Sequence, residues 1–408
     1  MNRLFFCSLV CVFFFKMDLS AQRTEVIPYI DFLKDQQTHP VDYIFQMFEK
    51  YDIVVLGERD HRDLSQYDLI KKIISDSRFV ETVGNVFTEV GAYNRTKWAN
   101  QILKNEYNTY AEFEEELRHL YRELESWNLI WEKYNFWDFL SYIYSINTKL
   151  QPSQKISLFF TDVPFDWSNC NTREDWETFR RNFRNKFWRD SIMGHNMITE
   201  YNKILNSDES TRKKALIILN TPHSYQSYTI AENKKLRSAT SYIFDEFSDK
   251  VANVMINWLP FCKSGRYCGF VANGKWDAAF WALNNPSLGF DFKDSPFGLD
   301  NFDANEPQPP LENIKYQDVY TGFIFYGSVV SWDIVIGIPG IIDDMYGIEH
   351  MKRFEILFQN NKRTLEDEKE YYNVVRRYKV WHFGDKMSKN RIKRNIRYWL
   401  GRRISIGI

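Results

Sequence analysis

Apolar residues along the chain gather in short continuous runs, separated by longer segments in which apolar positions repeat at helical spacing. The runs cover residues 53–58, 85–90, 156–162, 215–220, 251–257 and 322–326. A strand with apolar side chains on both faces is typical of a parallel sheet that is covered by helices on both sides. The segments between the runs are long enough for crossover helices. The pattern therefore predicts an α/β fold, with a mostly parallel sheet between helical layers.

Two regions depart from this alternation. Residues 107–150 predict a helical insertion of two amphipathic helices, which either covers a cleft as a lid or forms an extra structural layer. Residues 284–313 are rich in Pro, Gly, Asn and Asp, which predicts a long loop that forms a binding rim or a mobile segment. The apolar stripes of the two inserted helices consist of Phe113, Leu117, Leu120 and Leu124, and of Phe136, Leu140, Ile143 and Tyr144.

The C-terminal part of the chain has a different character. Residues 344–408 are helical in pattern and increasingly basic, and their last stretch holds seven Lys or Arg and no acid. Ile392, Ile396 and Trp399 either dock this tail on the core or lay it on an anionic membrane as a peripheral contact. We expect one α/β domain over residues 22–343, followed by this basic helical extension.

The first residues have the pattern of a secretory signal. A short basic start precedes the apolar run 4–15, which is too short for a stable membrane span, and the small residues Ser20 and Ala21 follow it. We expect residues 1–21 to be a signal peptide that is cleaved near Ala21, so that the mature chain is exported to the periplasm or the extracellular space. An uncleaved anchor is the alternative.

Composition adds three points. The net charge of −1 over 408 residues gives no indication of a nucleic-acid partner. Aromatic residues make up 17% of the chain, which suits a large core and equally a pocket for a sugar or another ring. In an oxidising compartment Cys262 and Cys268 either form a disulfide or remain free thiols.

Ionisable residues stand where four of the apolar runs end. Glu58, Glu89 and Asp162 end the first three runs, and His223 follows the fourth. His61 lies three positions after Glu58. Because the carboxyl ends of parallel strands meet at one edge of the sheet, where α/β folds build their sites, we expect these side chains to converge.

A predicted helix at 187–205 adds a cation to this group. Arg189, Met193 and Asn196 share one face of it, at positions i, i+4 and i+7. An arginine that faces the interior needs an acidic partner or an anionic ligand.

Together these motifs resemble the erythromycin-esterase-like proteins, over roughly residues 40–330. That family belongs to a wider superfamily with ChaN-like haem-binding proteins and TIKI-type metalloproteases. The chain departs from the family pattern at Asn220, where a second histidine is common, and at Gly194-His195, where small and acidic residues are common. The motifs that carry the resemblance are Gly57-Glu58-Arg59-Asp60-His61, Glu89, Arg189-Asp190 with Met193 and Asn196, and His223.

The resemblance implies an exported hydrolase in which a histidine-activated water attacks an ester or lactone carbonyl. His61 is expected to act as the general base, as a neutral imidazole near its ordinary pKa. Glu58 and Glu89 would orient His61, and Arg189 with His223 would stabilise the oxyanion. The chain has no GxSxG motif, so a serine nucleophile is not supported.

The expected substrate is a small molecule, with contacts to Asp162, Asn196 and Asp166, and the esterase interpretation needs no cofactor. Two alternatives use the same cluster. In the first, a divalent metal, Zn²⁺ or Mn²⁺, activates the water. In the second, the protein is not an enzyme and binds haem or another ligand through one of the two histidines. The ligands of the metal alternative would be Glu58, His61, Glu89 and His223.

Overall fold

The computed structural model describes most of the chain after the expected signal peptide. Residues 1–21 lie outside the described residues, and so do Cys262 and Cys268, whose pairing stays a prediction. The described ranges are 23–125, 128–183, 186–208, 211–230, 234–260, 269–303, 311–359, 362–382 and 388–401.

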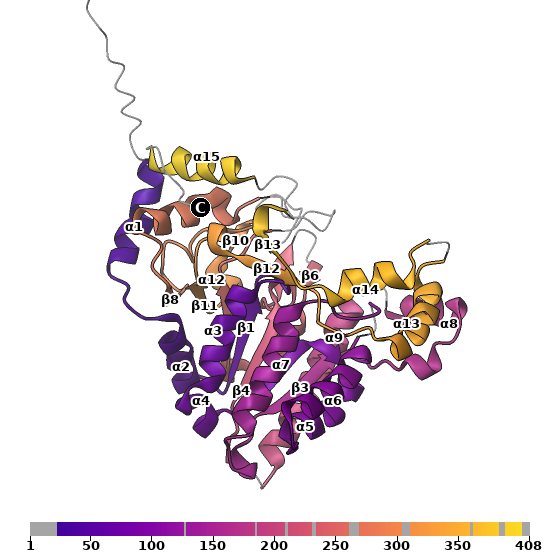
Figure 1. The fold of residues 1–408 in the computed structure, drawn as a ribbon. Helices are drawn as coiled ribbons and strands as arrows, with labels where there is room; N and C mark the ends of the chain where they lie inside the picture. Colours follow the sequence, from indigo (N-terminus) through magenta and orange to yellow (C-terminus); the bar gives the residue numbers. More distant parts are fainter. Residues whose placement is uncertain are drawn as a thin grey trace, which may run out of the picture.

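A seven-stranded sheet forms the centre of the fold, in the order β3-β2-β4-β1-β7-β11-β8 (Figure 1). Neighbouring strands pair in parallel, except that β8 pairs antiparallel with β11 at the edge. Each of the six predicted runs overlaps one of the parallel strands, so the predicted mostly parallel α/β sheet is confirmed. The strands are β1 (Ile53–Glu58), β2 (Asn85–Ala92), β3 (Ser157–Asp162), β4 (Ala215–Asn220), β7 (Val251–Ile256), β8 (Leu288–Asp291) and β11 (Gly322–Phe325).

Helices cover both faces of this sheet. Within the part of the chain that the structure describes, no helix has the length and apolar character needed to cross a bilayer. The helices are α1 (Ile27–Lys34), α2 (Pro40–Lys50), α3 (Leu64–Ser75), α4 (Ser77–Thr82), α5 (Thr96–Lys104), α6 (Tyr110–Arg122), α7 (Tyr134–Asn147), α8 (Arg173–Phe183), α9 (Lys186–Asn206), α10 (Ala239–Phe247), α11 (Lys275–Ala282), α12 (Tyr316–Val319), α13 (Asp344–Leu357), α14 (Leu365–Asn373) and α15 (Lys389–Leu400).

The central strand β1 shows why the apolar runs are continuous. Val54 and Leu56 belong to the apolar core that the sheet shares with α2 to α7. Ile53 and Val55 point to the other face, into a core with α9 and α10. Successive side chains of a strand point to opposite faces, so a strand between two helical layers needs apolar residues at every position.

The predicted helical insertion forms α6 and α7, and it is a structural layer. Phe113 of α6 and Phe136 of α7 are fully buried. The ring of Phe113 stacks on that of Tyr144, with centroids 3.7 Å apart. Thr109 caps α6 by accepting a hydrogen bond from the backbone of Glu112. Burial of both stripes in the main core excludes a detached lid built from these helices.

The expectation of a plain loop over residues 284–313 is wrong in part. β8 lies within this stretch, and β9 (Asn301–Phe302) pairs with β10 (Leu311–Lys315). A Cβ on Gly289 of β8 would lie 2.5 Å from the Cβ of Tyr43, so the glycine admits the close approach of α2. The glycine that made this stretch look like a loop therefore serves helix packing.

The C-terminal extension docks on the core, and it is not wholly helical. β13 (Arg376–Lys379) pairs antiparallel with β12 (Asp333–Ile336). α8, α13 and α14 lie together at one side of the molecule (Figure 1). Ile392 and Ile396 of α15 are fully buried in the core that contains α11. A two-stranded sheet of β5 (Tyr228–Ile230) and β6 (Lys234–Leu236) completes the described elements.

Candidate active site

The carboxyl edge of the sheet gathers the predicted ionisable residues. Glu58 and Asp162 are the last residues of β1 and β3, and Glu89 lies in the irregular end of β2. His223 ends a 3₁₀-helix (Thr221–His223) that follows β4 directly. All four side chains are buried. The structure thus brings these predicted residues together, as the parallel arrangement requires.

His61 stands between two carboxylates. Its Nδ1 lies 2.9 Å from Oε2 of Glu58, and its Nε2 lies 3.6 Å from Oε1 of Glu89. Gln66 of α3 donates a hydrogen bond of 3.2 Å to the other oxygen of Glu58. Since a carboxylate only accepts hydrogen bonds, this arrangement suits an imidazole that carries protons on both nitrogens.

The loop that carries His61 is fixed by a fully buried arginine. Arg59 pairs with Asp63, the N-cap of α3, and donates hydrogen bonds of 3.0 Å to Oδ1 of Asn257 and 2.9 Å to the backbone oxygen of Tyr326. A buried guanidinium with these partners ties the loop to β7 and β11. The position of His61 is therefore determined before any substrate binds.

Arg189 enters the cluster from α9. Its Nε and Nη2 each lie 2.9 Å from an oxygen of Asp162, which makes a bidentate pair. Nη2 also donates to Oε1 of Glu89 at 3.2 Å. Nη1 lies 3.3 Å from Nε2 of His223. The buried-facing arginine that the helix pattern predicted thus has two acids as partners.

His223 differs from His61 in the partners of its two ring nitrogens. Its Nδ1 contacts Oδ1 of Asp190, a buried carboxylate on α9. Its Nε2 faces Arg189, which can only donate, and lies 3.5 Å from Oε1 of Glu89. An imidazole with its proton on Nδ1 satisfies both contacts, because Nδ1–H then donates to Asp190 and the electron pair of Nε2 accepts from Arg189. The backbone N–H of Asn220 donates to Oε2 of Glu89 at 2.8 Å.

The charges of the cluster act strongly on one another. Burial lowers the pKa of His61, but Glu58 and Glu89 raise it to about 10. Burial raises the pKa of Glu89, but the neighbouring His223, His61 and Arg189 hold it well below its ordinary value. The expectation that His61 stays neutral near its ordinary pKa is therefore wrong, because two carboxylates favour its protonated form.

The connection between α6 and α7 contributes a wall that the sequence analysis missed. The rings of Trp131 and His61 meet edge to face, with centroids 5.0 Å apart, and Nζ of Lys133 lies 4.2 Å from the centroid of the Trp131 ring. Glu125 is buried, and burial together with the charge of Asp162 raises its pKa to about 8. These residues lie in no recognisable motif, and only the packing of the insertion brings them to the site.

The cluster reaches solvent through two of its members. The side chains of His61 and Arg189 are 20% and 21% exposed, whereas those of Glu58 and Glu89 are 1% and 5% exposed. A substrate that approaches the sheet edge would therefore meet His61 and Arg189 first.

The three expected substrate contacts differ in their placement. Asp162 lies in the cluster, where it binds Arg189. The amide of Asn196 donates to the backbone oxygen of Thr161 at 2.9 Å and so fastens α9 to β3. Asp166 lies outside the cluster, because it caps the following 3₁₀-helix and pairs with Arg95 at 3.4 Å. An aspartate just after a strand is often a cap, and this position is one.

The geometry does not fit the expected metal ligand set, nor a haem bound through His61. Among the described residues, no three His, Cys, Asp or Glu side chains form a group that could hold a metal ion. The guanidinium of Arg189 lies among Glu89 and His223 and supplies the positive charge there. Both nitrogens of His61 face carboxylates, so neither is directed toward a metal or a haem iron.

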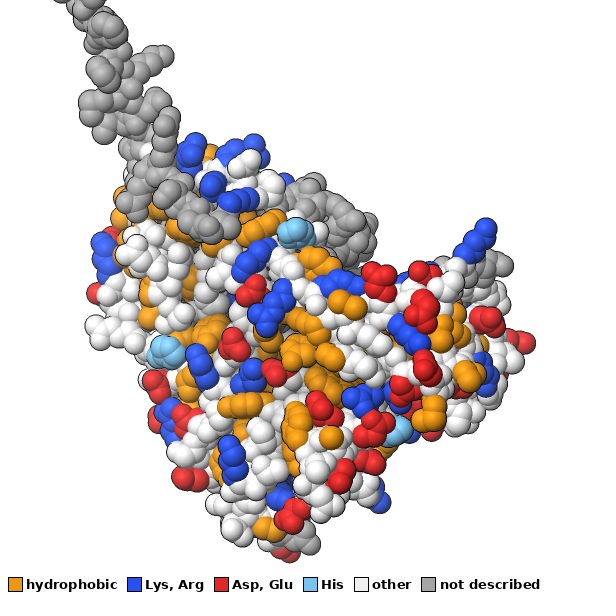
Figure 2. Space-filling view, in the orientation of Figure 1, with side chains coloured by type: hydrophobic (Ala, Val, Ile, Leu, Met, Phe, Trp, Pro, Cys, Tyr) orange, Lys and Arg blue, Asp and Glu red, His pale blue; other side chains and the backbone are white. Residues whose placement is uncertain are grey.

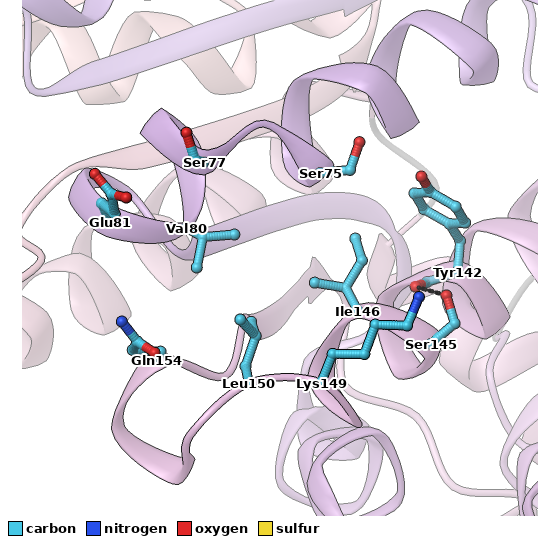
Figure 3. A pocket seen from close by; sticks show the side chains of 10 residues that line it. All are labelled: Ser75, Ser77, Val80, Glu81, Tyr142, Ser145, Ile146, Lys149, Leu150 and Gln154. Carbon is cyan, nitrogen blue, oxygen red and sulfur yellow. Dashed lines mark hydrogen bonds between the residues drawn. The ribbon is translucent and has the colours of Figure 1, made fainter.

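A cavity of about 460 Å³ lies at the opposite end of the sheet (Figure 3). It is bounded by the ends of α3 and α7 and by α4, with Val80, Tyr142, Ile146 and Leu150 among its lining residues. Strands β2 and β3, which follow α4 and α7 in the chain, begin at this end of the sheet. Strand β1, which precedes α3, also begins there. The cavity is therefore remote from the cluster and is not its substrate cleft.

Comparison with known proteins found only remote structural similarity. No protein-family model and no curated protein matches the sequence. A mutant of erythromycin esterase EreC in its open conformation matches with a TM-score of 0.46 and 10% identity, over 76% of this chain and 97% of that chain. A succinoglycan biosynthesis protein matches with a TM-score of 0.47 and 9% identity, over 76% and 98%. ChaN of Campylobacter jejuni, in a structure with cofacial haem, matches with a TM-score of 0.30 and 13% identity, over 52% and 85%. These three structures are at most 13% identical to the chain, and their TM-scores are at most 0.47.

Proposed function

We propose that this chain is an exported hydrolase that cleaves a carboxylic ester or a lactone of a small molecule with a histidine-activated water. The observation that carries the proposal is the contrast between the two histidines on either side of Glu89. In the proposed state His223 carries its proton on Nδ1, toward Asp190, and presents the electron pair of Nε2 to Arg189, whereas two carboxylates hold His61 in its protonated form. The proposal of export rests on the signal-like pattern of residues 1–21.

His223 is the general base in this proposal, in place of His61. Asp190 accepts the Nδ1 proton, which leaves Nε2 to take a proton from the attacking water. The carboxylate then stabilises the imidazolium that forms, as in histidine–aspartate pairs of other hydrolases. His61 does not suit this role, because a pKa of about 10 leaves few molecules with a neutral ring near neutral pH.

His61 and Arg189 act on the oxygen atoms of the substrate. Both are positively charged and partly exposed at the sheet edge, so they stabilise the oxyanion that develops when water attacks the carbonyl carbon. When the ester C–O bond breaks, His61 gives its proton to the leaving alkoxide oxygen. His223 then releases its proton to water and His61 takes one up from water, which resets the site, since the side chains of His61 and His223 are 20% and 10% exposed.

The test is substitution of the proposed base and of its partner. His223→Gln is expected to lower kcat by about 10³-fold or more, and Asp190→Asn by about 10²-fold, with smaller changes in KM. The measurement is the initial rate of hydrolysis of a panel of p-nitrophenyl esters and lactones, with and without a chelator.

His195→Gln is the matched control, because His195 lies on the same helix as Asp190 and its side chain is exposed. It should retain wild-type rates, and the chelator should change none of them. Wild-type rates in His223→Gln would refute the assignment of the base. A wild-type protein that hydrolyses no member of the panel would refute the ester and lactone class.

A further inference from the structure

The outer face of α15 is a basic surface that the proposed hydrolase site does not use. The helix buries Ile392, Ile396 and Leu400 on the core. Figure 2 shows Lys and Arg side chains gathered over this helix, at the top of the view. The helix contains no acid, and its cations are Lys389, Arg391, Lys393, Arg394 and Arg397.

The docking of α15 is specific, so this surface has a fixed shape. Trp399 Nε1 and Asn395 Nδ2 both donate to the backbone oxygen of Asn273, at 2.9 Å each. Gly274 has a φ of +75° and allows this approach, since a Cβ there would lie 1.8 Å from Oδ1 of Asn395. A helix fixed at these points holds its cations in a constant arrangement.

A small pocket opens within this basic surface. Its volume is about 270 Å³, and it is lined by Asn273, Arg391, Arg394, Asn395 and Tyr398. Two guanidinium groups with amide and phenol side chains are the donors that bind a phosphate group. The pocket is thus suited to one phosphate, with further cations around it.

The start of the described chain lies beside the same surface. The backbone N–H of Arg23 donates to the backbone oxygen of Trp399 at 3.0 Å, and its guanidinium lies 3.8 Å from the centroid of the Tyr398 ring. Tyr398 is 48% exposed, and tyrosine is enriched where proteins meet the lipid headgroup region.

We propose that the α15 surface binds anionic phospholipid membranes, with the phosphate of one headgroup seated between Arg391 and Arg394. Charge complementarity supports an anionic partner, because this face is basic while the whole chain has a net charge of −1. The exposed Tyr398 favours a lipid surface over nucleic acid. Bound in this way, the protein would present its hydrolase site close to a membrane.

The experiment is sedimentation of the full chain with vesicles. Vesicles of phosphatidylcholine with about 30 mol % phosphatidylglycerol are compared with vesicles of phosphatidylcholine alone. The variants are Arg391→Ala/Arg394→Ala and Arg391→Lys/Arg394→Lys, and the control is Arg180→Ala/Arg181→Ala, which removes the same charge from the exposed face of α8. Residues 1–22 are present in every protein, so their contribution cancels in the comparison.

The wild type and the α8 control should bind the anionic vesicles at least about tenfold more strongly than the neutral ones, and about 0.5 M salt should abolish the difference. The alanine pair should lose the difference with unchanged circular dichroism and melting temperature. The lysine pair should retain only part of it, because lysine cannot form the bidentate contact with phosphate. Three results would overturn the proposal: equal binding of the wild type to both kinds of vesicle, no loss of binding in the alanine pair, or tighter binding to a DNA duplex than to the anionic vesicles. A lysine pair that binds as the wild type does would overturn the placement of a phosphate between Arg391 and Arg394.

Discussion

Arg189→Met is expected to lower the free energy of unfolding by about 3–5 kcal/mol and kcat by about 10²–10³-fold. The guanidinium binds both oxygens of Asp162 and also Glu89, whose side chains are 3% and 5% exposed. Removal of the cation leaves these carboxylates facing one another in a buried place. Loss of one partner of a buried pair costs more than the pair itself contributes, because the remaining charge is uncompensated.

The measurement is urea unfolding at neutral pH, combined with a double-mutant cycle. Asp162→Asn keeps the Oδ1 that accepts the backbone N–H of Val163 at 2.8 Å but removes the charge. The double variant should therefore recover a part of the stability that Arg189→Met loses. Arg189→Lys should be intermediate, since an ammonium cannot match both oxygens of Asp162. A loss below about 0.5 kcal/mol, as for a surface ion pair, would show that the contact is not the buried network described here.

The members of the site on the sheet edge could be predicted from the sequence, and the reason is topological. Glu58, Glu89 and Asp162 each follow a run with apolar residues on both faces, which fixes a parallel strand and its direction. The carboxyl ends of such strands meet by geometry alone. His223 follows the fourth run and needed no other information. The local pattern of apolar residues and the direction of the strands were sufficient to predict that these four side chains lie close together.

Other members depended on contacts that no local pattern records. Trp131 and Glu125 reach the site because α6 and α7 pack as a layer, and their connection then falls beside His61. Asp190 stands in the sequence next to Arg189, but its partner His223 belongs to a different element. Asp166 was expected at the site but lies outside it, because its side chain caps the 3₁₀-helix that follows it in the chain.

The protonation state of His61 is the clearest case of what the sequence lacks. The chain order places Glu58 three residues before His61, but the ring is also close to Glu89, at 3.6 Å, from a different strand. One carboxylate with partial exposure would leave the pKa nearer its ordinary value. Two carboxylates in a buried cluster reverse the effect of burial. Because Glu89 adds to the effect of Glu58 and favours protonated His61, the proposed mechanism assigns the role of base to His223.

The raised pKa of His61 predicts a specific dependence of stability on pH. In the unfolded chain His61 ionises near pH 6.5, and in the folded protein its pKa is about 10. The folded state therefore binds the proton more tightly, and the resulting stabilisation is fully present below about pH 6.5 and is lost as the pH rises through about 10. By linkage this contribution amounts to roughly 4–5 kcal/mol. The same deprotonation removes the proposed proton donor, so kcat/KM should fall above about pH 10.

His61→Gln should remove most of this dependence. Between about pH 6.5 and 10, the wild type is expected to lose stability by several kcal/mol relative to the variant, as measured by urea unfolding at successive pH values. The charge of His61 lowers the pKa of Glu125, which is about 8, so both proteins also carry Glu125→Gln and the difference between them isolates His61. His119→Gln is the control, since the side chain of His119 is 51% exposed on α6, and it should follow the wild type. If His61→Gln loses stability with pH as steeply as the wild type does, the two carboxylates do not hold His61 protonated, and His61 again becomes the candidate for the base.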